Sequence, residues 1–391
     1  MLFVKTAELK AGMRLARPIY SKEGVLLYER NSRLTSQSIN SVKNFGLIGI
    51  FILEPAEPVP PMTKDDIEFE RFQTMNVYAI DDELGRIIQT KRATKTQVIT
   101  ANVIRSYGHL DKKINFVQNL RSKEDYVCKH SLNVAILCAM ITHVMNMKLD
   151  EQLDTVIAAV VHDVGKLMLA KSMPEYMEDP DAVERYEVQG FDLVDKTFSS
   201  NPGVKRICVQ AQKMQSNFEK GIFNPDIKQV TGAKVLLVAN VYDEMTAMQF
   251  EGEPASEVRA LRLLLENPEV FDPEVVDAMI QSINILGAGS CVELNTGEKG
   301  LVLVQNNENI LRPMVLTFDT NMIVDLSNEF AYGDMEIKDI MKTMDNRYVL
   351  DTEALKRSGF AFEEPEYVSV SGEKEYAENS EGEEYIPGRD F

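Results

Sequence analysis

The feature that most constrains the fold of this 391-residue chain is an uncharged stretch near its middle. Residues 130–147 include no Asp, Glu, Lys or Arg. That length is marginal for a bilayer span, which needs ~20 apolar residues, and polar members such as Asn133 and His143 would be costly in hydrocarbon. Apolar residues recur at helical spacing on one face: Val134, Leu137, Ile141 and Val144. We therefore predict a buried helix of a soluble protein and no membrane span.

A helical pattern continues on both sides of this stretch. It extends over about residues 63–286, and residues 156–161 are wholly apolar. The sequence thus predicts a mainly α fold. Its main domain is a helical bundle over residues 99–286, preceded by a linker and a helix over residues 61–98.

Smaller modules flank the helical region. Residues 1–60 combine short apolar runs, turns and one helix-like segment, which predicts a small α+β module that a proline-rich linker ends. Residues 287–346 have the pattern of short strands joined by Gly and Asn turns, a small β module. In the first module we expect strands at 24–28 and 47–53 and a helix at 36–46.

The net charge limits the partners. The chain carries 61 acidic and 42 basic side chains, a formal charge of −19. A field of this sign repels nucleic acid and anionic lipid, so we expect no DNA partner. A phosphate-bearing ligand would need a local basic or metal-lined site. The acid-rich tail, residues 347–391, is predicted to be disordered.

The cysteines and the amino terminus favour a reducing compartment. The four cysteines form no CxxC pair, and the first residues carry charge early without a long apolar run. Reduced, buried cysteines in a cytoplasmic protein are the simplest interpretation.

The motif that carries chemistry is AAVVHDVGK, residues 158–166. His162 and Asp163 are adjacent at the end of an apolar helix, and an imidazole with a carboxylate can hold a divalent cation. Lys166 follows one turn later and could meet a phosphate oxygen. His130 lies upstream at a distance that allows two antiparallel helices to bring it beside His162. The alternative is a hydrogen-bonded core histidine with Asp163 as a helix cap.

Two motifs together resemble the HD phosphohydrolase superfamily: KHSLNVAILC and, after it, AAVVHDVGK. The order of segments resembles the HD-GYP family of bacterial cyclic di-GMP phosphodiesterases. The segment ELKAGMRLARPIYSKEGVLLY is similar to the module that often precedes such domains, and GAGSCVELNTGEKGLVLVQNNENILRPMVL to the segment that commonly follows them. The resemblance covers about residues 1–325, and its specific part is the His-Asp core.

The resemblance implies roles for individual residues. His130, His162 and Asp163 match metal ligands of the family. Lys166 matches the lysine after the His-Asp pair, which makes Lys166 and Asp163 the candidate catalytic residues. Asn240, in AKVLLVANVYDEMTAM, stands where the family has a ligand aspartate.

The chain also departs from the family pattern. Asp243 matches a second aspartate that is not a ligand, but three expected ligand histidines are absent. Tyr186 stands at one of these positions and residues 210–213 at the other two, and no histidine follows His162. The Gly-Tyr-Pro signature is missing from SNFEKGIFNP.

Too few ligands remain for two cations, because a hard cation takes about six including waters. We therefore predict one divalent ion, Fe or Mn, or none. The predicted function is binding or regulation in bacterial second-messenger signalling, with a cyclic dinucleotide or another nucleotide as ligand. One alternative is a single-metal phosphohydrolase acting on such a nucleotide. Another is a helical domain that binds a protein partner through a Met-rich surface.

Overall fold

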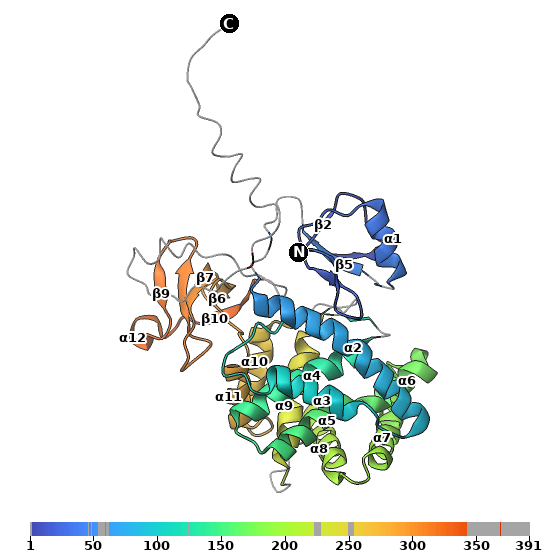
Figure 1. Cartoon of the computed structure of the whole chain (residues 1–391). Helices are drawn as coiled ribbons and strands as arrows, with labels where there is room; N and C mark the ends of the chain where they lie inside the picture. The colour runs from blue at the N-terminus through green and yellow to red at the C-terminus, as the bar shows by residue number, and fades with distance from the viewer. Residues whose placement is uncertain are drawn as a thin grey trace, which may run out of the picture. The chain divides into compact units, whose positions relative to one another are not determined.

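The fold is mainly α, as the sequence predicts, with small sheets in both end regions (Figure 1). The chain divides into two compact units, Met1–Glu68 with Asp351–Phe391, and Phe69–Leu350. The four cysteines are buried and form no disulfide bond. The computed structural model describes residues 2–45, 47, 49–53, 59, 62–119, 121–122, 125–222, 228–248, 254–341 and 368.

The first unit is a small α+β module. Its antiparallel sheet has the strand order β1-β5-β2, and β3 pairs with β4 in a separate hairpin. Helix α1 begins at a capping box formed by Thr35 and Ser38. Its buried residues Ile39 and Val42 pack with Ile50 of the sheet in a small core. The elements are β1 Leu2–Lys5, β2 Arg14–Leu15, β3 Ile19–Tyr20, β4 Leu26–Tyr28, α1 Ser36–Asn44 and β5 Gly49–Leu53.

The predicted elements of this module lie close to their expected positions. The helix expected at 36–46 is α1, and the strands expected at 24–28 and 47–53 are β4 and β5. Gly46, most of the proline-rich linker and the acidic tail apart from Val368 lie outside the described residues. The disorder of the tail therefore stays a prediction.

The second unit contains the helical bundle. Helix α4 packs against α3, α5, α9 and α11, while α5 packs against α8 and α9, and α6 against α7. The helices from the linker onward are α2 Lys64–Thr90, α3 Thr96–Tyr107, α4 Tyr126–Val144, α5 Leu149–Val161, α6 Val164–Ser172, α7 Pro180–Thr197, α8 Pro202–Glu219, α9 Thr231–Thr246, α10 Glu257–Glu266 and α11 Pro273–Ser282.

Helix α4 contains most of the uncharged stretch of the sequence. By length and composition it could cross a membrane, but 83% of its most apolar window is buried inside the structure. Core helices of globular proteins pass the same test of length and composition. Packing against α3, α5, α9 and α11 accounts for the lack of charge in α4 after Lys129.

A five-stranded antiparallel sheet of order β10-β6-β7-β8-β9 follows the bundle. It belongs to the same compact unit as the helices. The domain boundaries that we predict near residues 60, 98, 286 and 346 stay predictions. The elements are β6 Cys291–Leu294, β7 Lys299–Val304, β8 Met314–Thr317, β9 Ile323–Asp325, α12 Glu329–Tyr332 and β10 Ile337–Ile340.

Candidate metal centre

Four polar side chains meet inside the helical bundle. His130 lies in the second turn of α4, and His162 follows the last residue of α5. Asp163 precedes α6, and Asn240 lies within α9. His130, Asp163 and Asn240 are at most 5% exposed, and the His162 side chain is 9% exposed. The fold therefore brings together all four residues that the sequence predicts as ligands.

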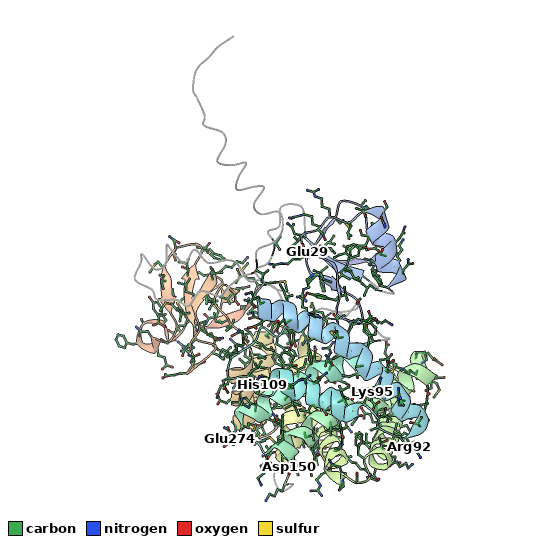
Figure 2. The ribbon with its side chains drawn as sticks, viewed as in Figure 1. Glu29, Arg92, Lys95, His109, Asp150 and Glu274 are labelled. Atoms are coloured by element: carbon green, nitrogen blue, oxygen red, sulfur yellow. The ribbon has the colours of Figure 1, made fainter. Side chains whose placement is uncertain are left out.

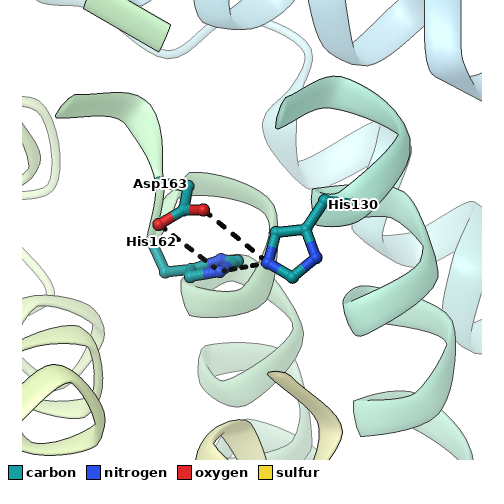
Figure 3. A group of neighbouring side chains, drawn as sticks. All are labelled: His130, His162 and Asp163. Atoms are coloured by element: carbon teal, nitrogen blue, oxygen red, sulfur yellow. Dashed lines mark hydrogen bonds and ion pairs between the residues drawn. The ribbon is translucent and has the colours of Figure 1, made fainter. Parts of the chain in front are cut away.

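The ligand atoms of these side chains converge, as Figure 3 shows for three of them. The Nε2 atoms of His130 and His162 are 3.2 Å apart. Asn240 Oδ1 lies 2.8 Å from the first and 2.9 Å from the second. Asp163 Oδ2 lies 3.6 Å from His130 Nε2, and Asp163 Oδ1 lies 3.7 Å from His162 Nε2.

Hydrogen bonds on the outer sides of the two rings fix their tautomers. His130 Nδ1 lies 2.7 Å from Asp243 Oδ2, and His162 Nδ1 lies 2.8 Å from Ala159 O. Both partners are acceptors, so each Nδ1 carries a proton. Burial lowers the pKa of His162, and this effect outweighs the nearby Asp163 carboxylate, which raises it. The lowered pKa favours the neutral ring. A neutral ring then turns the lone pair of Nε2 toward the centre.

A chain of contacts orients the Asn240 amide. Gln215 Nε2 donates to Glu244 Oε2 at 2.8 Å and to Glu219 Oε1 at 3.2 Å. Gln215 Oε1 is therefore the acceptor for Asn240 Nδ2, at 2.6 Å. This orientation leaves Asn240 Oδ1 facing the two histidines.

These atoms form a set of converging electron-pair donors. Asp163 Oδ2 is buried and has no hydrogen-bond partner among the described residues. Converging lone pairs repel one another unless a cation lies between them. Ligands about 2.1 Å from an octahedral cation are about 3.0 Å apart, close to the separations between the histidine, amide and carboxylate atoms. The residues present therefore fit one divalent cation.

The break between α5 and α6 places the His-Asp pair. Asp163 stands at the position before α6, but its side chain makes no capping hydrogen bond to the helix. Its carboxylate is turned toward the histidines instead (Figure 3). The alternative interpretation of Asp163 as a helix cap therefore does not describe this side chain.

Close packing of α6 on α7 fixes the start of α6. A Cβ at Gly165 would lie 2.2 Å from the Tyr186 carbonyl oxygen, and a Cβ at Gly190 would lie 2.6 Å from Gly165 N. Glycine at both positions lets the two backbones touch. This contact sets the positions of Asp163 and Lys166, which flank Gly165.

A buried hydrogen-bond network contacts His130 on the side of the ring that faces away from the metal centre. Asp243 accepts from Arg121 at 2.7 Å through Oδ1 and from His130 through Oδ2, and the Arg121 and Asp243 side chains are 0% exposed. Burial raises the pKa of Asp243, but Arg121 and His130 outweigh burial and hold this pKa well below its ordinary value. The ionised carboxylate stabilises the Nδ1 proton of His130, as carboxylates behind metal-bound histidines do.

Further members of this network escaped the sequence analysis. Gln118 and Asn133 donate to Asp243 Oδ1, and the Tyr126 ring stacks on His130 at 5.7 Å between ring centres. The one signal for them in the sequence is a set of polar side chains just before and inside the largely apolar helix α4. That pattern does not identify which buried group they contact.

Lys166 contacts carboxylates at the edge of the centre. Its Nζ lies 3.1 Å from Asp163 Oδ1 and 3.6 Å from Glu244 Oε1. Burial lowers the pKa of Lys166, but Asp163, Glu244 and Glu187 outweigh burial and raise it above the ordinary value. The Lys166 amine is therefore protonated and carries a positive charge. Its predicted contact with a phosphate stays a prediction.

Other positions singled out in the sequence lie away from the four ligand residues. His109 is exposed in the turn after α3 (Figure 2), and His143 bonds to the exposed Asp111 at 2.9 Å. The Tyr186 hydroxyl accepts from Ser172 at 3.0 Å. The structure therefore supplies no replacement ligand from these side chains.

Comparisons with known proteins agree with an HD-type domain. Residues 110–200, which include both histidines and Asp163, match the HDOD domain family. Over 248 residues the chain is 25% identical to a cyclic di-GMP phosphodiesterase of Pseudomonas aeruginosa, covering 61% of this chain and 58% of that protein. The chain thus spans little more than half of the length of that relative. No solved structure matches the chain. The two matches support an HD-superfamily protein.

Proposed function

We propose that the chain is a bacterial, cytoplasmic signalling protein of HD-GYP type that binds one divalent cation and acts by ligand binding rather than hydrolysis. The cation is iron or manganese, held by His130, His162, Asp163 and Asn240. The ligand is cyclic di-GMP or another nucleotide, a class supported by the match to a cyclic di-GMP phosphodiesterase.

One observation carries the proposal. Two Nε2 atoms, an amide oxygen and a carboxylate oxygen converge in a buried place, and among the described residues that carboxylate oxygen has no hydrogen-bond partner. Nitrogen and oxygen donors of this kind suit first-row divalent ions. A cation removes the repulsion between the lone pairs, so its binding stabilises the packing of α4, α5 and α9.

The burial of the centre favours binding over hydrolysis. Metal-assisted hydrolysis needs a cation-bound water that reaches the substrate. Here the His130 side chain is fully buried and that of His162 is 9% exposed. The four protein ligands also leave about two of six positions for water and substrate together.

A single-metal phosphohydrolase is the second candidate function. The Lys166 side chain is 21% exposed and lies beside Asp163. An ammonium there could attract a phosphodiester to a cation-bound water. This candidate predicts turnover, whereas the first does not.

Elemental analysis of the purified full chain tests the cation. We expect about one Mn or Fe ion per chain, and loss of that ion in His162→Ala. The matched control is His143→Ala, because His143 bonds to an exposed carboxylate outside the centre. A chain without bound metal after loading with Mn and Fe contradicts the proposal.

Calorimetry and a hydrolysis assay separate the two functions. We expect the Mn-loaded chain to bind cyclic di-GMP, or a member of a nucleotide panel, without turnover. Turnover that disappears in Asp163→Asn would favour the phosphohydrolase. Absence of both binding and turnover across the panel would reject both functions.

A further inference from the structure

The Lys166 ammonium contacts two carboxylates and is attracted by a third. Asp163 Oδ1 is 3.1 Å away and Glu244 Oε1 is 3.6 Å away, and Glu187 is a third source of attraction. Lysine side chains near a surface usually extend their ammonium into water. This one is instead directed into an acidic cluster, with its side chain 21% exposed.

Asp163 joins this cluster to the metal centre. Its Oδ1 contacts Lys166, while its Oδ2 lies 3.6 Å from His130 Nε2 and has no hydrogen-bond partner among the described residues. A carboxylate has two oxygens and can therefore serve two cations at once. The position beside Asp163 Oδ1 already holds a cation, the Lys166 ammonium.

Amide side chains hold the other two carboxylates. Gln212 Nε2 donates to Glu187 Oε2 at 2.9 Å, and Gln215 Nε2 donates to Glu244 Oε2 at 2.8 Å. The positions of these carboxylates therefore do not depend on the lysine alone. Gln215 also accepts from Asn240, so the acidic cluster and the metal centre share one scaffold.

We propose that Lys166 is a tethered cation that fills a second cationic position beside the metal centre, so that the chain binds one divalent ion rather than two. The inference rests on the proposed function, because it takes a first cation at the histidines as given. An ammonium fixed to α6 partly neutralises the three carboxylates. Without it, closely spaced and partly buried carboxylates form a hard oxygen site that a divalent ion can fill.

The test is the metal stoichiometry of Lys166→Met, a neutral variant of similar length. The full chain is loaded with Mn²⁺, freed of excess ion by gel filtration and assayed by elemental analysis and electron paramagnetic resonance. We expect about two ions per variant chain against one in the wild type. The spectrum should change from that of an isolated Mn²⁺ ion to that of a coupled pair.

Two further variants provide controls. Lys171→Met removes another lysine of α6, whose ammonium pairs with Asp81 at 2.9 Å and whose side chain is 48% exposed. It should keep one ion. Lys166→Met combined with Glu244→Gln removes a carboxylate ligand and should return the count to one.

The outcomes separate this inference from the proposed function. One ion in both wild type and Lys166→Met overturns the inference and leaves the function intact, whereas two ions in the wild type also overturn the inference. No ion in the wild type rejects the proposed function and, because the inference takes a first cation as given, rejects the inference with it. A variant that folds only with Mn²⁺ supports the inference, and one that stays unfolded with Mn²⁺ overturns it.

Discussion

Asn240 and Asp243 lie one helical turn apart on α9 and differ by one charge. The neutral amide faces the two histidines, while the carboxylate lies behind His130 and pairs with Arg121. The centre thus contains one ligand carboxylate, from Asp163. Since each added carboxylate increases the attraction for a cation, this arrangement suits a single ion.

Replacing Asp243 with Asn should weaken cation binding by about 10–100-fold, because His130 loses the partner that holds its tautomer. It should also reduce the free energy of unfolding by about 3–5 kcal/mol, because Arg121 stays buried without its counter-charge. Mn²⁺ titration and denaturant unfolding measure the two effects. Asp111→Asn is the control, since this exposed carboxylate pairs with His143. Equal losses in both variants would refute the prediction.

At the level of elements, the helices around the centre are fixed at their starts. The α2 carboxylate of Glu83 accepts the backbone amides of Thr94, Lys95 and Thr96 at 2.6, 2.7 and 3.0 Å, where α3 begins. The start of α6 is fixed differently, by backbone contact at Gly165. Both devices position bundle helices without taking part in any chemistry.

Glu83→Gln should lower the free energy of unfolding by about 2 kcal/mol at neutral pH, because a buried carboxylate that accepts several amides is lost. Burial raises the pKa of Glu83, but the hydrogen bonds from Lys95 and Thr94 outweigh burial and lower it below the ordinary 4.5. Its contribution is therefore complete above about pH 4.5 and declines as the pH falls toward the folded-state pKa.

Unfolding curves of wild type and Glu83→Gln at several pH values measure this dependence. The difference between them should shrink below about pH 4.5. The exposed Glu68 of α2 provides the control, because Glu68→Gln should change stability by less than about 0.5 kcal/mol at any pH. A stability difference that grows as the pH falls would show that the predicted direction of the pH dependence is wrong.

Gly165→Ala should destabilise the chain by about 1–3 kcal/mol and weaken cation binding, because the new Cβ overlaps the Tyr186 carbonyl and pushes α6 away from α7. Thermal unfolding and Mn²⁺ titration measure both effects. Gly85→Ala on α2 is the matched control, since its nearest neighbour would be Lys171 Nζ at 3.6 Å. That variant should be neutral or more stable, because alanine favours helix.

For the whole molecule, the centre links segments far apart in the chain. His130 and Asn240 are separated by 110 positions and belong to different helices of one bundle. A cation bound between them would stabilise the folded state, because the unfolded chain cannot assemble the same ligands.

Mn²⁺ should therefore raise the free energy of unfolding by about 2.7 kcal/mol when its concentration is 100 times the dissociation constant. The midpoint temperature of thermal unfolding should rise accordingly. A chelator should reverse the shift, and His162→Ala should remove it. His143→Ala should retain it. An equal shift in both variants would place the ion elsewhere.

Several features were predictable because they depend on residue type and spacing. The burial of α4 follows from the uncharged stretch that makes up most of it, and the positions of α1, β4 and β5 follow from local turn and capping residues. The meeting of His130 with His162 follows from two consecutive helices. The network of Arg121, Gln118 and Asp243 was not predictable, because sequence spacing does not give the direction of buried polar side chains.

The sequence by itself determined a mainly α chain with an HD-type motif and no histidine after His162. These properties follow directly from the composition of the chain and the order of its residues. Only the tertiary structure decided that the Asn240 oxygen faces the histidines and that Lys166 is directed at Asp163 and Glu244. Those contacts arise where α4, α5, α6 and α9 cross, and the packing of helices distant in sequence sets which way each side chain points.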